Sequence, residues 1–304
     1  MSAIPKRIRL VEVGPRDGLQ NESQVLSLEA KVGFIEDLAA AGIKTIEATS
    51  FVRADKIPQM SDASDLYARV SGLTSKGISL PCLVPNLKGL EIALAAGVKE
   101  IALFSATSDT FNKKNINASV DESLERLEEV AREASKSGLK LRGYVSTVFG
   151  CPYEGKTSID KLKHVAQKLL DFGCYDVSLG DTIGVGHPLQ VKEILGLLRA
   201  QFDLSSFSMH FHDTRGLAVA NVMASLEEGM NSFDSSAGGI GGCPYAKGAS
   251  GNVATEDILY LFESLGIETG IDREKVFLAS EKILKALSKS SLSKVHQARA
   301  RERE

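Results

Sequence analysis

The sequence lacks the features that would indicate a membrane or nucleic-acid-binding protein. It contains no run of about 18 or more apolar residues, the length needed for a transmembrane helix. Its 36 Lys and Arg residues nearly balance its 39 Asp and Glu residues, and the net charge of −3 argues against nucleic acid or a membrane surface as a partner. With 43% hydrophobic and 25% charged residues among 304, the composition is typical of a soluble globular protein.

Cysteine is scarce and scattered. The four residues Cys82, Cys151, Cys174 and Cys243 form no C-x-x-C pair. This pattern favours reduced thiols in a cytosol over a disulfide framework or a structural zinc site. A strand-like segment begins at Ile8, which leaves no room for a signal or transit peptide before it. We therefore expect a cytoplasmic protein.

A repeated pattern organises the chain: an amphipathic stretch ends in glycine, and a β-rich run follows. The pattern occurs at Gly42, Gly77, Gly97, Gly138, Gly173 and Gly229. A glycine at the end of a helix readily adopts the left-handed conformation of a C-cap, so each occurrence predicts a helix, a cap and a strand. Two more strands are predicted at 8–13 and 207–212, and the clearest helices at 26–41, 121–137, 159–172 and 218–228.

Eight strands alternating with helices predict an α/β fold, a (β/α)₈ or TIM barrel. An open, doubly wound sheet is the main alternative. No linker rich in Pro, Gly or Ser divides the chain, so we expect one catalytic domain over residues 1–304. Its barrel would cover about 7–265, and a C-terminal helical extension would cover about 266–304. That extension is predicted to contain a helix near 272–287 and a mobile polar tail.

Polar residues gather where the predicted strands end. In such barrels the active site lies at the carboxyl ends of the strands. The residues that fall there are Arg16 and Asp17 after the first strand, Glu47 at the end of the second, Asp181 after the sixth, and His210 and His212 at the end of the seventh. Oxygen and imidazole groups from distant parts of the chain are thus predicted to converge on one rim.

His210 and His212 give the clearest indication of a binding site, because residues i and i+2 of a strand point to the same side. Two imidazoles there could bind one ion, or they could be polar residues at the barrel mouth with no ligand. The carboxylates from other strands favour a metal. A mixture of oxygen and imidazole donors suits Mg²⁺ or Mn²⁺, while zinc or iron stays possible.

The segment after the eighth strand, 234–252, is rich in glycine and contains Cys243. It lacks the Lys-Ser/Thr pair of a P-loop, so a phosphate-binding loop is the weaker hypothesis. A flexible lid is the alternative, in which Cys243 could exchange a proton with a substrate carbon. A buried cysteine without a function is a third possibility.

Most of the remaining cysteines and histidines are predicted to pack in the structure without a chemical role. This applies to Cys82, Cys174 and His164, whereas Cys151 and Tyr153 follow the fifth strand and lie on the predicted functional rim. Lys113 and Lys114 follow the fourth strand. These two lysines could attract an anionic substrate or could simply belong to a solvated loop.

Several motifs together resemble 3-hydroxy-3-methylglutaryl-CoA lyase, one of the metal-dependent barrel lyases. The resemblance rests on P-R-D-G-L-Q-N-E from Pro15, E-A-T-S-F-V from Glu47, P-N-L-K-G from Pro85, K-K-N-I-N from Lys113, R-G-Y-V-S from Arg142, G-C-P-Y-E-G-K from Gly150, S-L-G-D-T-I-G-V-G from Ser178, H-F-H-D-T from His210 and G-G-C-P-Y-A-K-G-A-S-G-N from Gly241. The last motif is the most specific, because related condensing synthases usually carry a G-E-R-type sequence there.

The resemblance implies a role for each matching residue. The metal ligands would be Asp17, His210, His212 and Asn252; Arg16 would stabilise an enolate; Cys243 would act as acid or base; and Glu47, Asp181 and Tyr144 would line the substrate site. Apart from the resemblance, Lys113 and Lys114 are the candidates for contacts with CoA, because of their charge. His210 or Asp181 would take the substrate's hydroxyl proton. The family is also typically a homodimer.

The implied reaction splits 3-hydroxy-3-methylglutaryl-CoA into acetyl-CoA and acetoacetate, a step of leucine degradation and ketone-body formation. It requires a divalent cation but no nucleotide or redox cofactor. A condensing acyl-CoA synthase and a non-catalytic binding barrel are the alternatives. Arg215 replaces a tyrosine of the animal enzymes and could affect substrate preference. The C-terminal R-E-R-E lacks their peroxisomal address, which is consistent with a bacterial cytoplasmic protein.

Overall fold

The computed structural model describes residues 4–242 and 251–302. Its strands are parallel and form one sheet in the order β2-β1-β9-β8-β7-β6-β5-β4-β3. The strands are β1 Arg9–Glu12, β2 Thr45–Ile46, β3 Thr49–Ser50, β4 Cys82–Leu83, β5 Glu100–Ala106, β6 Lys140–Ser146, β7 Cys174–Asp181, β8 Phe207–Phe211 and β9 Ser232–Ser235. They coincide with the eight predicted strand positions once β2 and β3 are taken as one interrupted strand.

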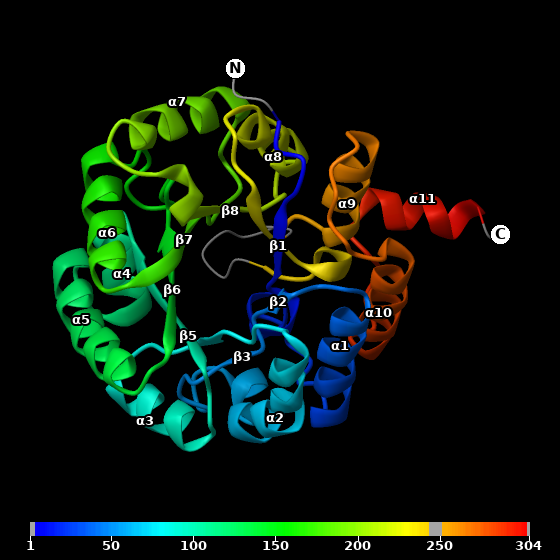
Figure 1. Cartoon of the computed structure of the whole chain (residues 1–304), viewed down its shortest axis with the longest axis horizontal. Helices are drawn as coiled ribbons and strands as arrows, with labels where there is room; N and C mark the ends of the chain where they lie inside the picture. Colours follow the sequence, from blue (N-terminus) through cyan, green and yellow to red (C-terminus); the bar gives the residue numbers. More distant parts are fainter. Residues whose placement is uncertain (1–3, 243–250, 303–304) are drawn as a thin grey trace.

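The two ends of the strand order belong to one short segment of chain. Only Glu47 and Ala48 separate β2, which pairs with β1, from β3, which pairs with β4. Across this gap the Glu47 amide donates to the Glu12 carbonyl at 2.8 Å and the Ala48 amide donates to the Pro81 carbonyl at 2.9 Å. The sheet therefore curves into a ring (Figure 1). This is a TIM-barrel-like α/β fold rather than the open, doubly wound alternative.

Helices surround the strands on the outside of the ring (Figure 1). In the described residues they are α1 Leu28–Ala40, α2 Ala63–Val70, α3 Leu87–Ala95, α4 Asp109–Ile116, α5 Val120–Lys136, α6 Ile159–Asp171, α7 Pro188–Arg199, α8 Ala218–Glu227, α9 Thr255–Ser264, α10 Arg273–Ala286 and α11 Lys294–Glu302. The four clearest predicted helices match α1, α5, α6 and α8 within about two residues at each end. None of the helices in these residues is long and apolar enough to cross a membrane.

Local sequence signals account for the helix boundaries. Ser119 accepts a hydrogen bond from the Glu122 amide and Glu122 reaches back to the Ser119 amide, which forms a capping box at the start of α5. All six glycines of the repeated pattern have a positive φ, as predicted. Glycine is needed at position 42 for a second reason besides its positive φ. A Cβ atom there would lie 2.5 Å from the Gly270 carbonyl oxygen.

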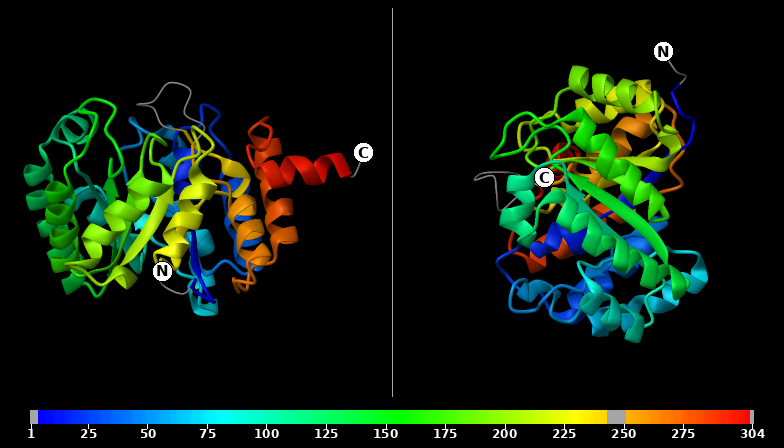
Figure 2. Two further views of the ribbon diagram at one scale, coloured as in Figure 1. Left: turned by 90° about the horizontal axis from the view of Figure 1, so that it is seen from above. Right: turned by 90° about the vertical axis from the view of Figure 1, so that its left-hand side faces the viewer.

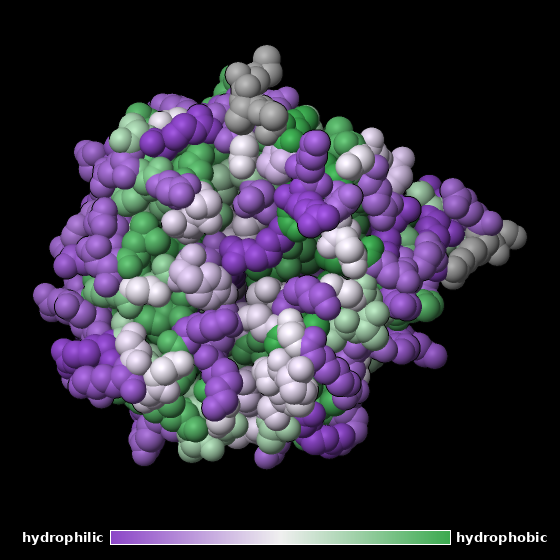
Figure 3. Space-filling model, in the orientation of Figure 1, coloured by the Kyte–Doolittle hydropathy of each residue, from purple (hydrophilic) through white to green (hydrophobic). Residues whose placement is uncertain are grey.

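The hydrophobic core lies between the sheet and the helices. On α5 the buried side chains Leu124, Leu127, Val130 and Ala134 recur every three or four residues and form one apolar face. Side chains of this face belong to one continuous cluster that also includes residues of the strands, such as Ile101. The barrel face seen in Figure 3 is a mosaic of hydrophilic and hydrophobic residues without a large continuous apolar area.

Two helices follow α9 on one side of the ring. Helix α10 lies where the sequence predicts a helix near 272–287, with Asp272 as its N-cap. Where the sequence predicts a mobile polar tail, the structure has α11, which points away from the body of the molecule (Figure 2). Its first turn is capped from α9, because the Asp257 carboxylate accepts hydrogen bonds from the Lys294 and Val295 amides.

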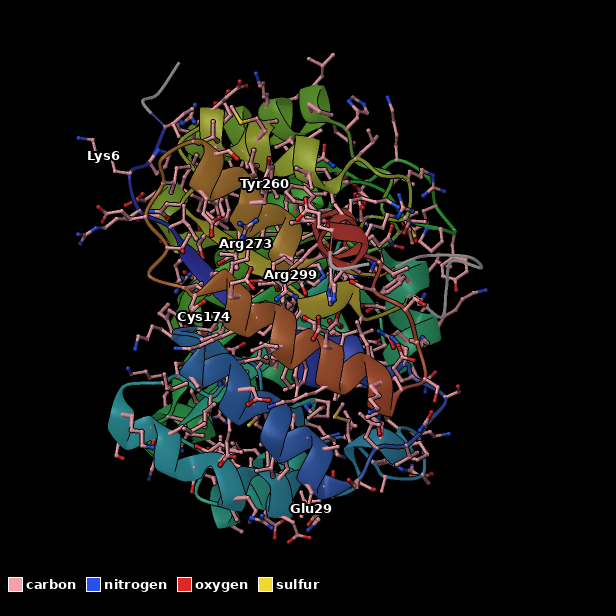
Figure 4. The ribbon with its side chains drawn as sticks, turned by 90° about the vertical axis from the view of Figure 1, so that its right-hand side faces the viewer. Lys6, Glu29, Cys174, Tyr260, Arg273 and Arg299 are labelled. Atoms are coloured by element: carbon pink, nitrogen blue, oxygen red, sulfur yellow. The ribbon has the colours of Figure 1, made fainter. Side chains whose placement is uncertain are left out.

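Aromatic and charged side chains fasten the C-terminal helices to each other. Tyr260, Arg273 and Arg299 lie on the side of the molecule where α9, α10 and α11 meet (Figure 4). The guanidinium carbon of Arg299 lies 4.4 Å from the centre of the Phe277 ring, and its nitrogens pair with Glu274 and Glu281 at 2.6 and 3.0 Å. These long-range contacts fix the position of a polar C-terminal helix, which the local sequence does not predict.

Glu12 joins three segments at the end of β1. Its Oε1 accepts hydrogen bonds from the Gly14 amide at 2.8 Å and the Ala237 amide at 3.0 Å, and its Oε2 accepts one from the Thr255 hydroxyl at 2.7 Å. The side chain is fully buried, and this burial raises its pKa to about 8 although the three hydrogen bonds oppose the shift. One carboxyl group thus holds the turn after β1, the turn after β9 and the start of α9.

The first prediction concerns the pH dependence of folding stability. Because the folded-state pKa of Glu12 lies above its ordinary value of 4.5, its contribution is fully present below about pH 4.5 and is lost as the pH rises through about 8. In Glu12→Gln the amide can keep both backbone contacts and donate to Thr255. As the pH rises from 5 to 9, the unfolding free energy of the parent should fall by about 3 kcal/mol more than that of the variant.

Chemical denaturation at a series of pH values measures this difference. Glu29→Gln on the exposed face of α1 is the control and should follow the parent at every pH. Parallel pH profiles for the parent and Glu12→Gln would contradict the prediction.

Candidate active site

Three side chains converge at the carboxyl ends of the strands. Asp17 lies in a short π-helical turn after β1, His210 lies on β8 and His212 directly follows β8. One ligand atom from each lies within 4.8 Å of the others. The two imidazole rings face the same side with their centres 5.2 Å apart, and both residues are buried. The predicted pairing of the histidines at one strand end is thus confirmed.

Asn252 adds a side-chain amide to this group. Its Nδ2 donates to Asp17 Oδ2 at 2.9 Å, and an isolated antiparallel bridge places it beside His212. Its Oδ1 is buried and has no hydrogen-bond partner in the part of the chain that the structure describes. A buried carbonyl oxygen without a partner is energetically costly. A cation held by Asp17 and the two histidines would satisfy it, so the residues present fit a metal site.

The pKa shifts of Asp17 and His212 favour a bound cation, whereas that of His210 opposes one. Burial opposes the ionised form of Asp17, but Arg16 and the two histidines outweigh it and lower the pKa of the carboxyl group. Burial and the neighbouring His210 lower the pKa of His212 to about 4, so its ring is neutral at physiological pH. Burial also disfavours charging of His210, yet the hydrogen bond and charge of Asp234 raise its pKa overall. Oxygen and nitrogen donors of this kind bind divalent cations.

Arg16 lies beside the three clustered residues and is held from several sides. Its Nε donates to Glu47 Oε2 at 2.7 Å and its Nη1 donates to Asp17 Oδ1 at 2.9 Å. Its guanidinium carbon lies 5.4 Å from the centre of the Tyr144 ring on β6. Although burial opposes its charge, Glu47 and Asp17 raise its pKa, so a permanent positive charge lies next to the candidate metal site. The structure thus brings Arg16, Glu47 and Tyr144 together.

Asp181 ends β7, as predicted, but its carboxylate turns toward the backbone of its own loop. Its two oxygens accept hydrogen bonds from the Val185 and Gly186 amides, both at 2.9 Å. Burial raises its pKa against these hydrogen bonds. The exposed Arg215 donates to the Ile183 and Gly184 carbonyls of the same loop. Arg215 therefore supports the turn that holds Asp181, and within residues 4–242 and 251–302 no hydrogen bond or ion pair joins it to Asp17, His210 or His212.

The remaining predicted residues lie in three kinds of environment. Lys113 and Lys114 are exposed on α4, and Lys114 Nζ lies 4.1 Å from the centre of the Tyr153 ring. Cys151 is buried and donates to the Ser108 hydroxyl. Burial raises the pKa of Cys174 to about 12, which favours its assignment to packing. Cys243 falls outside the described residues.

Sequence reasoning missed two charged residues below the cluster. Arg142 on β6 is fully buried, and it donates from Nε to Asp176 Oδ2 at 2.8 Å and from Nη2 to Asp234 Oδ1 at 2.7 Å. Asp234 on β9 in turn lies with its Oδ2 3.2 Å from His210 Nδ1. A charged residue inside a predicted buried strand, as in L-R-G-Y or S-F-D-S, is a signal that could have revealed them.

The fold and site define a barrel protein with a candidate divalent-metal centre at the carboxyl ends of its strands. The HMGL-like family model matches residues 7–283, and the chain belongs to that family. It is 48% identical to the mitochondrial hydroxymethylglutaryl-CoA lyase of Pongo abelii over 298 residues, which cover 98% of this chain and 91% of the relative.

Solved structures of the same family are also similar to this chain. A hydroxymethylglutaryl-CoA lyase from Pseudomonas aeruginosa is 45% identical, with a TM-score of 0.95 over 98% of this chain and 99% of that one. An HMG-CoA lyase from Acinetobacter baumannii in complex with coenzyme A and 3-methylmalate is 35% identical, with a TM-score of 0.91 over 98% and 97%.

The second prediction concerns the proposed ligand role of Asp17. Replacing it with alanine removes the carboxylate of the cluster, so we expect Asp17→Ala to weaken binding of Mn²⁺ by about 100-fold or more. Isothermal calorimetry measures the affinity. Asp213→Ala is a matched control, because that carboxylate follows His212 but bonds to the Ala218 amide at the start of α8. Equal affinity in the parent and Asp17→Ala would remove Asp17 from the ligand set.

Proposed function

We propose that the chain cleaves 3-hydroxy-3-methylglutaryl-CoA into acetyl-CoA and acetoacetate. The observation that carries this proposal is the cluster of Asp17, His210 and His212 beside the buried guanidinium of Arg16. A retro-Claisen cleavage needs both kinds of group, one to favour loss of a hydroxyl proton and one to stabilise a developing enolate. Relatives at about half identity over nearly the whole chain carry the name of this lyase.

The metal ligands in this proposal are Asp17, His210, His212 and Asn252, and the ion is Mg²⁺ or Mn²⁺. When bound, the cation lowers the pKa of the substrate's tertiary hydroxyl group. The Asp17 carboxylate, the neutral His212 ring and the Oδ1 of Asn252, which has no partner among the described residues, support this assignment. No nucleotide or redox cofactor is required, because the reaction transfers protons and breaks one carbon–carbon bond without net oxidation.

The described side chains suit the proton and charge movements of this cleavage. A base removes the tertiary hydroxyl proton, the new carbonyl of acetoacetate forms, and the electrons of the C2–C3 bond pass to the acetyl-CoA enolate. His210 bonds Asp234 through Nδ1 and is assigned to the metal, so we assign the base to Asp181, which lies opposite Phe211 in the register of β7 and β8 and thus beside His210. Arg16 stabilises the enolate, and Glu47 fixes the orientation of Arg16. Cys243 then protonates the enolate carbon.

The proposed substrate contacts come from Tyr144, which lies near Arg16, and from two exposed lysines of α4. The Tyr144 ring lies against that guanidinium and faces the substrate in this proposal. Lys113 and Lys114 on the exposed side of α4 would bind the phosphate groups of CoA. The positive charge of two adjacent lysines in the last turn of a helix supports this assignment.

We further propose one catalytic domain over 1–304, with the barrel at about 7–265 and α10 and α11 as a C-terminal extension. The protein would act as a homodimer in the cytoplasm. The free thiols of Cys82, Cys151 and Cys174 support a reducing compartment.

The third prediction tests the reaction itself. The purified protein should release acetoacetate from 3-hydroxy-3-methylglutaryl-CoA under reducing conditions with Mg²⁺ or Mn²⁺, and EDTA should abolish the release. A coupled assay for acetoacetate measures the rate. A folded, metal-loaded protein without this activity would contradict the proposal. Condensation of acetyl-CoA with a 2-oxo acid would then identify a synthase.

The fourth prediction separates proton transfer from metal binding. In Cys243→Ala we expect turnover to fall by about 10²–10⁴-fold, because a proton donor is lost while the proposed ligands remain. The dissociation constant for Mn²⁺ should not change. Cys82→Ala serves as the control, because that thiol is buried in β4 and its turnover should match the parent. Parent-like turnover in Cys243→Ala would exclude Cys243 from catalysis.

A further inference from the structure

Asp234 connects a proposed metal ligand to the interior of the barrel. Its Oδ2 lies 3.2 Å from His210 Nδ1 on β8 and accepts a hydrogen bond from the Ser178 hydroxyl on β7 at 2.7 Å. Its Oδ1 accepts a hydrogen bond from Arg142 Nη2 on β6 at 2.7 Å. The Asp234 and Arg142 side chains have no solvent exposure. Groups from three strands therefore fix both oxygens of one buried carboxylate.

We propose that Asp234 is a positioning residue that sets the orientation and tautomer of His210, and that Arg142 holds Asp234 in place for this purpose. The inference rests on the proposed function, in which His210 binds a divalent cation. A carboxylate can only accept hydrogen bonds, so the His210 ring places its proton on Nδ1. The lone pair of Nε2 is then left for the cluster with Asp17 and His212.

Asp176 offers a matched comparison inside the same network. Its Oδ2 accepts from Arg142 Nε at 2.8 Å, and its Oδ1 lies 2.6 Å from Arg9 Nη2. Asp176 and Asp234 are thus the two carboxylate partners of one buried guanidinium. Among them only Asp234 contacts His210. A change at either residue disturbs Arg142, but only a change at Asp234 disturbs the histidine directly.

An amide cannot reproduce the contacts of Asp234. In Asp234→Asn the NH₂ group must face either Arg142, where donor meets donor, or His210, where it forces the ring proton onto Nε2. In Asp176→Asn the NH₂ group can face Arg9, whose partly exposed side chain can move into water. The two variants thus remove equivalent charges and differ in their effect on the imidazole.

The fifth prediction compares the Mn²⁺ affinity of the parent, Asp234→Asn and Asp176→Asn by calorimetry, with folding checked by thermal melting. We expect the dissociation constant to rise about 10- to 100-fold in Asp234→Asn and to stay at the parent value in Asp176→Asn. Parent-like affinity in Asp234→Asn would overturn the inference. Equal weakening in both variants would also overturn it, because the effect would then belong to Arg142. A parent that binds no Mn²⁺ would instead refute the proposed metal site.

A second measurement needs no variant, and it decides the matter if Asp234→Asn does not fold. Nitrogen-15 spectra of the metal-free parent at pH 9 report which ring nitrogen of His210 carries the proton. A proton on Nδ1 supports the assigned role of Asp234. A proton on Nε2 overturns it.

Discussion

The burial of Arg142 is the constraint on which the interior of the barrel depends. A guanidinium without solvent exposure is tolerated only when its charge and its N–H groups are paired. Here Asp176, Asp234 and the hydroxyl group of Tyr144 supply that pairing from β7, β9 and the next inward position of β6. Replacing any one partner would leave a charge or donor uncompensated, so inward-facing residues of three strands must be considered as one unit.

The polar network reaches the site because strand residues alternate. On β8 the residues Ser208 and His210 face the network, and His212 continues the same side beyond the strand end. Phe211 lies between the two histidines and points to the opposite face of the strand. The centre of its ring lies 5.5 Å from that of Phe149, in the apolar layer between the sheet and the helices. One strand thus joins the hydrophobic core on one face and the candidate metal site on the other, and a register slip would exchange them.

Local sequence predicts what depends on local structure. The glycine caps, the eight strand positions and the pairing of His210 with His212 follow from patterns of two to four residues, and the structure has all of them. The contact of Arg142 with Asp234 spans 92 positions and depends on the register of neighbouring strands, which periodicity does not specify. The helix at 294–302 likewise depends on Asp257 and Phe277 from two earlier helices. The sequence points to Asn252 as a proposed ligand only through the family resemblance, because no periodicity or spacing singles it out.

Two separate supports hold the candidate ligands in place. Below the cluster, Asp234 anchors His210 from the barrel interior. Beside it, Glu12 binds the turn that carries Asp17 and the first residues of the turn after β9, and Thr255 links it to the segment just after Asn252. Because the supports act on different ligands, the distance between Asp17 and the histidines depends on both. A site assembled in this way has little freedom to adjust, which favours a fixed coordination geometry over adaptable binding.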